Sequence, residues 1–168
     1  MMARAGPKLA LRPFLPADAP LLAEIFRASI AELTGDDYST AQQEAWAAAA
    51  DDEAAFAARL AGAVTLLGTI DGSPVGFAAL AGGERLDMLY VHPAAAGQGV
   101  GTMLVDALER LARSRGAARL TAEVSDSAQD FFRRRGFSPR QRNSVPLGGE
   151  WLANTTMEKQ LAAKERAQ

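Results

Sequence analysis

The spacing of apolar residues predicts a helical first third of the chain, preceded by one short strand. Residues 8–14 alternate between apolar and polar positions and predict the strand. From Pro16 to Leu33 apolar side chains recur three or four residues apart, which places them on one face of a helix. Two shorter helices are expected next, over residues 42–50 and from Asp51 onward.

The middle of the chain has the pattern of strands. Three strands are predicted over residues 64–70, 75–81 and 85–91. The segments Asp71–Pro74 and Gly82–Gly83 between them have the composition of tight turns. Consecutive strands joined by such short turns pair antiparallel, so we expect a three-stranded meander.

The last third begins with a strongly amphipathic helix between Gly99 and Gly116. A strand over residues 119–124 follows, and the order strand, helix, strand predicts a crossover with parallel pairing. A short helix ending at Gly136 and two more strands, the second over residues 151–161, complete the pattern. We therefore predict an α/β fold with a mixed, mostly antiparallel sheet of six to seven strands, flanked by about four helices.

Composition limits the classes of function that the chain can have. The chain has 168 residues, of which 48% are hydrophobic and 23% charged, as in one globular domain, which we take as residues 1–168. We expect residues 164–168 to be a frayed tail. A net charge of −2 argues against a general nucleic-acid binder. No apolar run approaches the roughly 18 residues of a membrane helix, so we expect a cytoplasmic protein that does not bind membranes.

The counts of cysteine and histidine exclude several kinds of site. The chain has no cysteine, which rules out disulfides, thiolate nucleophiles and thiolate metal sites. Its one histidine, His92, cannot form a zinc cluster by itself, so we predict no metal site.

The segment after the third strand of the meander predicts an anion-binding turn. Val91-His92-Pro93 ends the strand, and Gly97, Gly99 and Gly101 alternate with other residues just before and within the start of the helix. Glycine permits a tight turn, and the first amides of a helix have no partner inside it and carry the positive end of its dipole. Strand, glycine turn and helix start together predict a phosphate site.

Two common phosphate motifs do not fit this turn. A dinucleotide fingerprint needs a third glycine or alanine, but that position is Thr102 when counted from Gly97 and Leu104 when counted from Gly99. A triphosphate-binding loop needs a Gly-Lys-Ser/Thr sequence, which the segment lacks.

The segment instead resembles the acyl-CoA motif of the GNAT superfamily of N-acyltransferases. In that motif the fourth strand is followed by Gln or Arg and then by two residues of any type. Glycine, one residue of any type, and glycine or alanine complete it. Here these positions run from Ala96, which replaces the usual polar residue, to Gly101. The segment Ala128–Phe137 also resembles the family's helix after the fifth strand, so the likeness covers residues 89–137 closely.

The resemblance implies acetyl-CoA as the cosubstrate and identifies the residues that would hold it. The pyrophosphate would lie on the backbone of the glycine turn, and the pantetheine arm would pair with the strand before it, in a gap between the fourth and fifth strands. Ser125 stands where family members often have an asparagine that bonds the cofactor, and Phe132 occupies the position of the family's usual tyrosine acid. The predicted cofactor residues are Leu89, Tyr90, Val91, Gly97, Gln98, Gly99, Val100, Gly101, Thr102, Ser125 and Phe132.

Candidate catalytic residues follow from the need for a neutral amine, which a general base can supply. The family often uses an acidic residue on the fourth strand, where Glu84 and Asp87 stand. Asp87 is the better candidate because it lies among apolar neighbours, although a carboxylate bonded to a neighbouring side chain is the alternative. Tyr38, in the loop expected near the substrate, is a candidate substrate contact or a packing residue.

We therefore predict an N-acetyltransferase that moves acetyl from acetyl-CoA to a primary amine of a small molecule or peptide. Without cysteine an acyl-cysteine intermediate is excluded, so the amine attacks directly in a ternary complex. The alternative is a catalytically inactive module that binds or senses acyl-CoA, which Ala96 and Phe132 would suit. A homodimer formed through one end of the sheet is compatible with either hypothesis.

Overall fold

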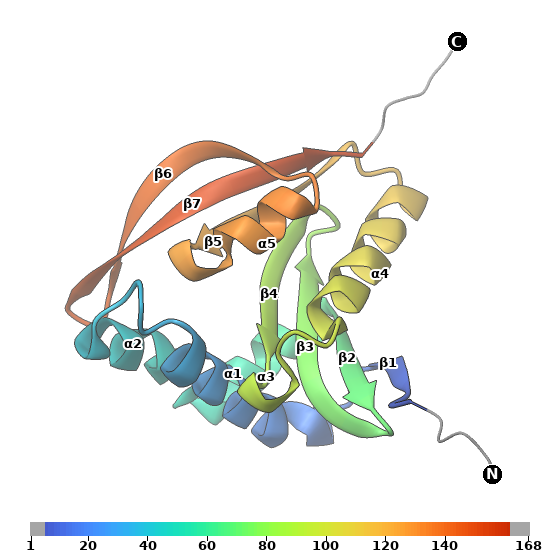
Figure 1. Ribbon diagram of the computed structural model, residues 1–168, viewed down its shortest axis with the longest axis horizontal. Helices are drawn as coiled ribbons and strands as arrows, with labels where there is room; N and C mark the ends of the chain where they lie inside the picture. The colour runs from blue at the N-terminus through green and yellow to red at the C-terminus, as the bar shows by residue number, and fades with distance from the viewer. Residues whose placement is uncertain (1–5, 162–168) are drawn as a thin grey trace.

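The predicted strands form one seven-stranded sheet in the computed structural model, which describes residues 6–161 (Figure 1). The strand order is β1-β2-β3-β4-β5-β7-β6, and every neighbouring pair is antiparallel except β4 and β5. The predicted meander and parallel crossover are therefore confirmed. The strands are β1 (Leu9–Pro13), β2 (Val64–Ile70), β3 (Ser73–Ala81), β4 (Arg85–Val91), β5 (Arg119–Ser125), β6 (Ser138–Leu147) and β7 (Glu150–Gln160).

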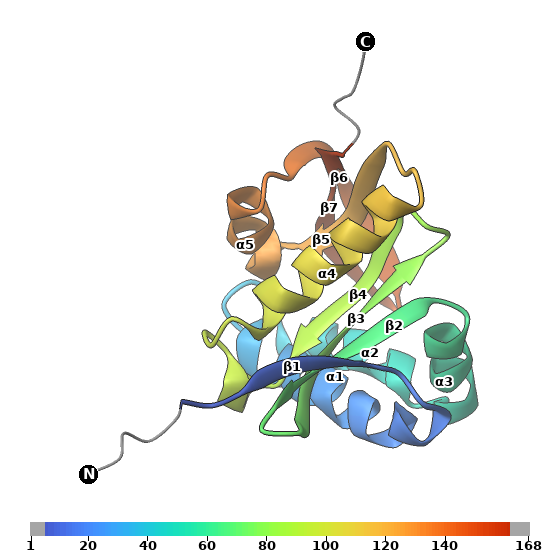
Figure 2. The ribbon, with the colours of Figure 1, turned by 90° about the vertical axis from the view of Figure 1, so that its right-hand side faces the viewer.

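Within the described part of the chain, five α-helices lie on the two faces of this sheet (Figure 2). One face packs against the helices of the first third of the chain, with Phe26 and Phe56 in that core. The other face packs against the amphipathic helix and the short helix, with Leu104 and Phe132 in that core. The helices are α1 (Ala19–Leu33), α2 (Thr40–Ala47) and α3 (Glu53–Ala61) on the first face, and α4 (Val100–Ser114) and α5 (Gln129–Arg134) on the second.

Three details differ from the expectation or lie outside it. The turn between β2 and β3 contains only Asp71 and Gly72, because both residues adopt the positive φ of a two-residue hairpin turn, so β3 begins two residues earlier than predicted. The segment after Phe137, which is only weakly strand-like, forms the ten-residue strand β6. The expected tail over residues 164–168 lies outside the described residues.

A close approach between sheet and helix fixes the start of α4. A Cβ atom on Gly68 of β2 would lie 2.8 Å from Cγ1 of Val100, the first residue of α4. Since real Cβ atoms do not approach so closely, glycine at position 68 lets the first turn of α4 rest directly on the sheet. The glycine turn that precedes α4 is thereby held beside the end of β4.

The sheet opens between its two parallel strands. Only Arg85 with Thr121 and Leu86 with Ala122 are paired between β4 and β5. Beyond these pairs both strands continue without pairing to each other, β4 as far as Val91 and β5 as far as Ser125. The opening lies where the sequence places the cofactor arm.

Candidate active site

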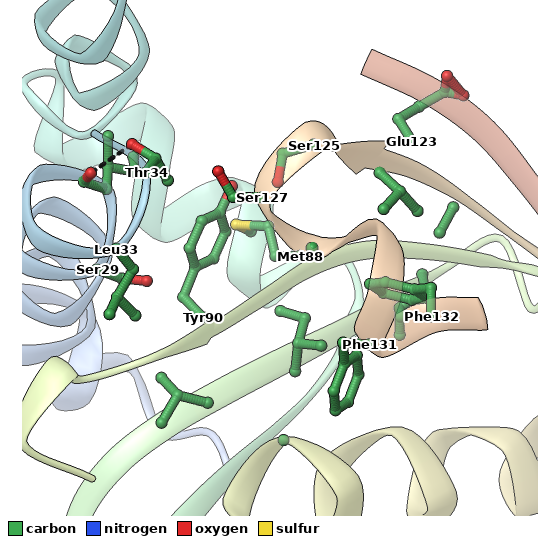
Figure 3. Close-up of a pocket in the computed structure, with 18 of the residues that line it drawn as sticks. Ser29, Leu33, Thr34, Met88, Tyr90, Glu123, Ser125, Ser127, Phe131 and Phe132 are labelled. Carbon is green, nitrogen blue, oxygen red and sulfur yellow. Dashed lines mark hydrogen bonds between the residues drawn. The ribbon is translucent and has the colours of Figure 1, made fainter. Parts of the chain in front are cut away.

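A cavity of about 280 Å³ lies in the opening between β4 and β5 (Figure 3). Its walls come from the two strands, the first turn of α4, the C-terminal half of α1 and the start of α5. Six of the predicted cofactor residues line it: Leu89, Tyr90, Val91, Gly101, Ser125 and Phe132. The other five predicted cofactor residues, Gly97 to Val100 and Thr102, form the turn and helix start that adjoin Gly101.

The glycine turn leaves hydrogen-bond donors available beside this cavity. Gly97 and Gly99 adopt positive φ values of 77° and 89°, and Gly99 caps α4 without a side chain. Within residues 6–161 the amides of Val100, Gly101 and Thr102 donate to no protein acceptor. Free amides at the positive end of a helix dipole bind anions, so this geometry fits a pyrophosphate.

Arg135 adds a positive charge to the same helix start. Its Nη2 donates to Oγ1 of Thr102 at 2.5 Å, and its guanidinium lies 4.9 Å from the centre of the Phe131 ring. The hydrogen bond to Thr102 joins the end of α5 to the first turn of α4, so two walls of the cavity are fixed to each other, whereas the contact with Phe131 lies within α5 and its C-cap.

A second cavity of about 280 Å³ adjoins the first and is lined by residues of β4, β5, α2, α3 and the β6–β7 hairpin. Gln42 of α2 donates to the carbonyl of Trp151 at 2.7 Å, so α2 is fastened to the β6–β7 hairpin at the edge of this cavity. Residues that line both cavities mark the place where they meet: Trp46, Leu86, Asp87, Tyr90, Glu123 and Ser125. A donor in the first cavity and an acceptor in the second would therefore meet at the opening between β4 and β5.

Asp87 stands at this junction but is held by two arginines. Its side chain is only 9% exposed, with Oδ2 2.8 Å from Nε of Arg59 and Oδ1 in contact with Nη1 of Arg85. Burial raises the pKa of Asp87, but the hydrogen bonds and charges of Arg59 and Arg85 outweigh burial and hold it below its ordinary value. The predicted base is thus an ion-paired carboxylate, and its role in proton transfer stays a prediction.

A bulge in β4 explains the direction of the Asp87 side chain. The register between β3 and β4 shifts at Ala79 and Leu80, opposite the segment that contains Asp87. Leu89 packs on the α4 face, and strict alternation would place Asp87 beside it. The extra residue of the bulge instead turns Asp87 toward Arg59 of α3, on the other face.

The Asp87→Asn substitution is expected to lower the free energy of unfolding by about 1–2 kcal/mol at pH 7, because hydrogen bonds to charged groups contribute about this much when the cations are half exposed. Since the folded-state pKa of Asp87 is lowered, this contribution is full above its unfolded pKa of about 3.9 and is lost as the pH falls through the folded value. Urea unfolding of both proteins between pH 7 and pH 2.5 measures it. A difference that stays constant or grows toward low pH would contradict this assignment.

Glu123 is a second carboxylate at the junction and was not among the predicted site residues. Its oxygens lie 2.7 and 2.9 Å from Oγ1 of Thr156, and Oε1 accepts a hydrogen bond from Nδ2 of Asn143 at 3.0 Å. In the described part of the chain it forms no ion pair. In β5 the side chains of Leu120, Ala122 and Val124 are buried on the α4 side of the sheet. This alternation is the signal that could have placed Glu123 on the other side of the sheet.

Tyr90 and Trp46 form the aromatic side of the junction. Nε1 of Trp46 donates to the hydroxyl of Tyr90 at 3.2 Å, and the Tyr90 ring packs edge-on against Phe26. Burial raises the pKa of Tyr90 to about 12, so its hydroxyl is neutral at physiological pH. Figure 3 shows this side chain extending from β4 toward Ser125 and Ser127.

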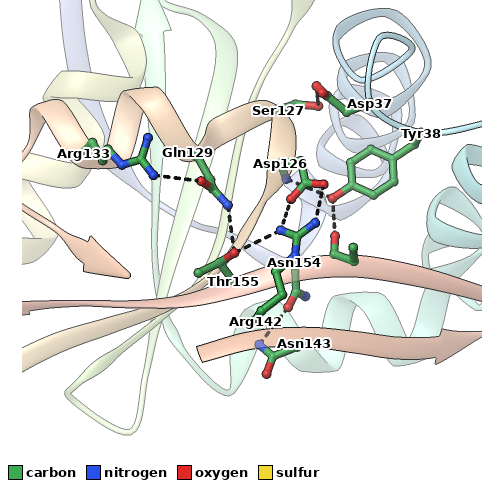
Figure 4. Close-up of polar contacts among 11 residues, drawn as sticks. Asp37, Tyr38, Asp126, Ser127, Gln129, Arg133, Arg142, Asn143, Asn154 and Thr155 are labelled. Atoms are coloured by element: carbon green, nitrogen blue, oxygen red, sulfur yellow. Dashed lines mark hydrogen bonds and ion pairs between the residues drawn. The ribbon is translucent and has the colours of Figure 1, made fainter. Parts of the chain in front are cut away.

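Tyr38 lines the second cavity, and its hydroxyl group forms hydrogen bonds with two other segments of the chain (Figure 4). The hydroxyl donates to the carbonyl of Ala153 at 2.5 Å and accepts from the amide of Asp126 at 3.0 Å. Asp126 also binds Arg142, so the loop after α1, the end of β5 and the β6–β7 hairpin form one network. The expected substrate contact of Tyr38 stays a prediction.

Comparisons with known proteins agree with this geometry. A family model described as an acetyltransferase (GNAT) domain matches residues 34–161. The chain is 31% identical over 147 residues to the uncharacterized N-acetyltransferase YafP of Escherichia coli strain K12, a match that covers 88% of this chain and 93% of YafP.

Two solved structures share the fold. A GCN5-related N-acetyltransferase from Rhodopseudomonas palustris is 60% identical, with a TM-score of 0.90, and the match covers 96% of this chain and 99% of that one. The PaiA N-acetyltransferase from Thermoplasma acidophilum, solved in complex with coenzyme A, has a TM-score of 0.76 at 18% identity, over 91% of this chain and 99% of that one.

The family model and the relatives support acetyl transfer and do not support an inactive binding module. Among the helices of residues 6–161, none has the length and apolar character needed to span a membrane. An opened sheet, a glycine turn at a helix start and a matching family model lead to one conclusion: this chain belongs to the GNAT family of acetyltransferases, with acetyl-CoA as its acyl donor.

Proposed function

We propose that this enzyme acetylates a primary amine of a small molecule or peptide in the cytoplasm, by direct attack within a ternary complex. The observation that carries this proposal is the meeting of two cavities at the opening between β4 and β5. The first cavity reaches the glycine turn at Gly101, and the second is lined by α2, α3 and the β6–β7 hairpin. An acyl donor in the first cavity and an amine in the second can therefore reach the same point.

We propose that acetyl-CoA lies in the first cavity with its pyrophosphate on the amides of residues 98–102. The backbone of Leu89 to Val91 pairs with β3 on one side but not with β5 on the other, so its free side can pair with the amides of the pantetheine arm, as another strand would. Ser125, which lines both cavities, is placed to contact the thioester end.

The reaction forms one bond and breaks another. The neutral amine nitrogen attacks the thioester carbonyl carbon, the carbon–sulfur bond breaks, coenzyme A leaves as its thiolate, and the proton still on the new amide nitrogen passes to that thiolate or to solvent. An alkylammonium has an ordinary pKa of about 10.4, so a proton must be removed before attack. Phe132 has no proton to donate, and a thiol of ordinary pKa about 8.5 leaves as an anion more readily than an alkoxide.

Glu123 is the carboxylate that we assign to the removal of the amine proton. Asp87 is already paired with Arg59 and Arg85, and the lowered pKa makes its carboxylate a weaker base. Glu123 accepts hydrogen bonds only from neutral groups among residues 6–161 and lines both cavities. Asp87 then acts by holding the two arginines in place.

The proposed function is tested by mixing the protein and acetyl-CoA with a panel of amines and measuring released thiol. We expect thiol release that depends on an amine, together with acetylated product detected by mass spectrometry. Acetyl-CoA without an amine, and amines without enzyme, are the controls. If acetyl-CoA raises the melting temperature but no amine class ever releases coenzyme A, the chain binds the cofactor without transferring its acetyl group.

A further inference from the structure

The second cavity, which the proposed function assigns to the amine acceptor, contains charges of both signs on different elements. Arg59 of α3 and Arg85 of β4 lie on one side, and Glu123 of β5 lies across the opening. Asp87 is the one carboxylate that the two arginines share. The arginine side of the cavity therefore has one positive charge in excess, whereas Glu123 has no cationic partner in the described residues.

The two arginines retain donors for a further anion. Arg59 uses Nε and Nη2 on Asp87, and Arg85 uses Nη1. Within residues 6–161, Nη1 of Arg59 and both Nε and Nη2 of Arg85 donate to no protein acceptor. The Arg85 side chain is 52% exposed, and Nε with Nη2 forms the fork that binds a carboxylate through two parallel hydrogen bonds.

The rest of the cavity limits the size and polarity of the acceptor. A volume of about 280 Å³ is below the usual range for drug-sized ligands and suits a smaller molecule. Its remaining walls are largely apolar and come from α2 and the β6–β7 hairpin: Trp46, Val145, Leu147 and Leu152.

We infer that the acceptor is a small amino acid, a molecule that carries both the reacting amine and a carboxylate. This inference rests on the proposed function and adds the class of substrate to it. The carboxylate binds the free fork of Arg85, with Nη1 of Arg59 beside it. The amine lies at Glu123, next to the opening through which the thioester is presented. An apolar side chain of the acceptor packs against Trp46 and the hairpin.

The test compares kcat/KM for matched acceptors: leucine against leucinamide and isoamylamine, and 6-aminohexanoate against hexylamine. The carboxylate-bearing member of at least one series is expected to be favoured by about 10- to 100-fold, the effect of one charge-assisted bidentate contact. The two series distinguish an α-amino acid from an ω-amino acid. A leucine-terminated tripeptide amide tests whether a peptide amine is accepted instead.

Arg85→Gln is expected to reduce this preference to about threefold or less, because it removes the fork. Arg110→Gln, at an exposed position on α4 remote from both cavities, is the matched control and should retain the full preference. The melting temperatures of both variants show whether each one folds. If a variant does not fold, the comparison of kcat/KM between matched acceptors in the wild-type enzyme still tests the inference.

The outcomes distinguish a failure of the proposed function from a failure of the substrate class. If no amine is acetylated, the proposed function fails and the substrate class fails with it. If amines are acetylated but carboxylate-free members or the peptide amide are equal or better substrates, the amino-acid inference alone is overturned. A preference that persists in Arg85→Gln would also overturn the assignment of Arg85.

Discussion

Replacing Glu123 by glutamine is expected to lower kcat by about 10²–10³-fold, within the range of general-base catalysis, while the Kd for acetyl-CoA changes by less than about twofold. Glutamine has nearly the same shape and can still accept hydrogen bonds from Asn143 and Thr156, so the local packing survives. What it loses is the ability to take a proton from the amine. Steady-state kinetics with the best acceptor, together with titration calorimetry for acetyl-CoA, measure the two quantities.

Two further variants make this result specific. Glu84→Gln removes an exposed carboxylate that lines neither cavity, and it should behave as wild type. Asp87→Asn leaves Arg59 and Arg85 without their shared anion, which lowers the stability of the protein. The activity of this variant is therefore compared with wild type only where unfolding measurements show that it is folded. If Glu123→Gln retains activity within threefold of wild type while folded Asp87→Asn is inactive, then Asp87 is the base.

Gly99→Val is expected to weaken acetyl-CoA binding by at least about 10-fold, because a β-branched residue at a φ of 89° is strained by about 1–3 kcal/mol and the turn must change to relieve it. A changed turn moves the amides at the start of α4 away from the pyrophosphate. The rise in melting temperature that acetyl-CoA produces in the wild type should be small or absent in the variant. Titration calorimetry with acetyl-CoA gives the affinity directly.

A second glycine supplies the control for backbone strain. Gly116, at the end of α4, has a similar φ of 83°, and a Cβ atom added to it would have no neighbour within 4 Å. Gly116→Val should therefore lower stability by a similar amount and leave the affinity for acetyl-CoA unchanged. Equal binding by Gly99→Val and wild type would contradict the role of this turn in holding the cofactor.

The fold was largely predictable because its elements have strong local signals. The helical spacing before Leu33, the hairpin turn at Gly72 and the glycines around α4 each predict one element and its end. Short turns fix antiparallel neighbours, and a crossover helix fixes a parallel pair. The antiparallel meander and the parallel pair of β4 and β5 follow from this order, whereas the opening between β4 and β5 was expected only from the resemblance to the GNAT superfamily.

The acceptor side was less predictable because it depends on residues that are distant in the sequence. The pairing of Asp87 with Arg59 joins residues from two elements, and the bulge in β4 that directs Asp87 toward α3 has no local signature. Glu123 is part of an ordinary alternating strand and gains its position only because Asn143 and Thr156 come beside it. Periodicity describes which face a residue occupies, but not which residues of other elements share that face.

The opening between β4 and β5 also makes the resistance of the protein to proteolysis depend on its ligand. A ligand that fills the opening binds only the folded chain, and at 100 times its Kd such a ligand adds about 2.7 kcal/mol to the free energy of unfolding. A stabilisation of about 2.7 kcal/mol lowers the population of unfolded molecules about 100-fold. Proteolysis acts mainly on opened or unfolded molecules, so its rate falls by about the same factor when exchange between folded and unfolded states is fast. A lower acetyl-CoA concentration is therefore expected to make the protein more susceptible to proteolysis, in addition to lowering its catalytic rate.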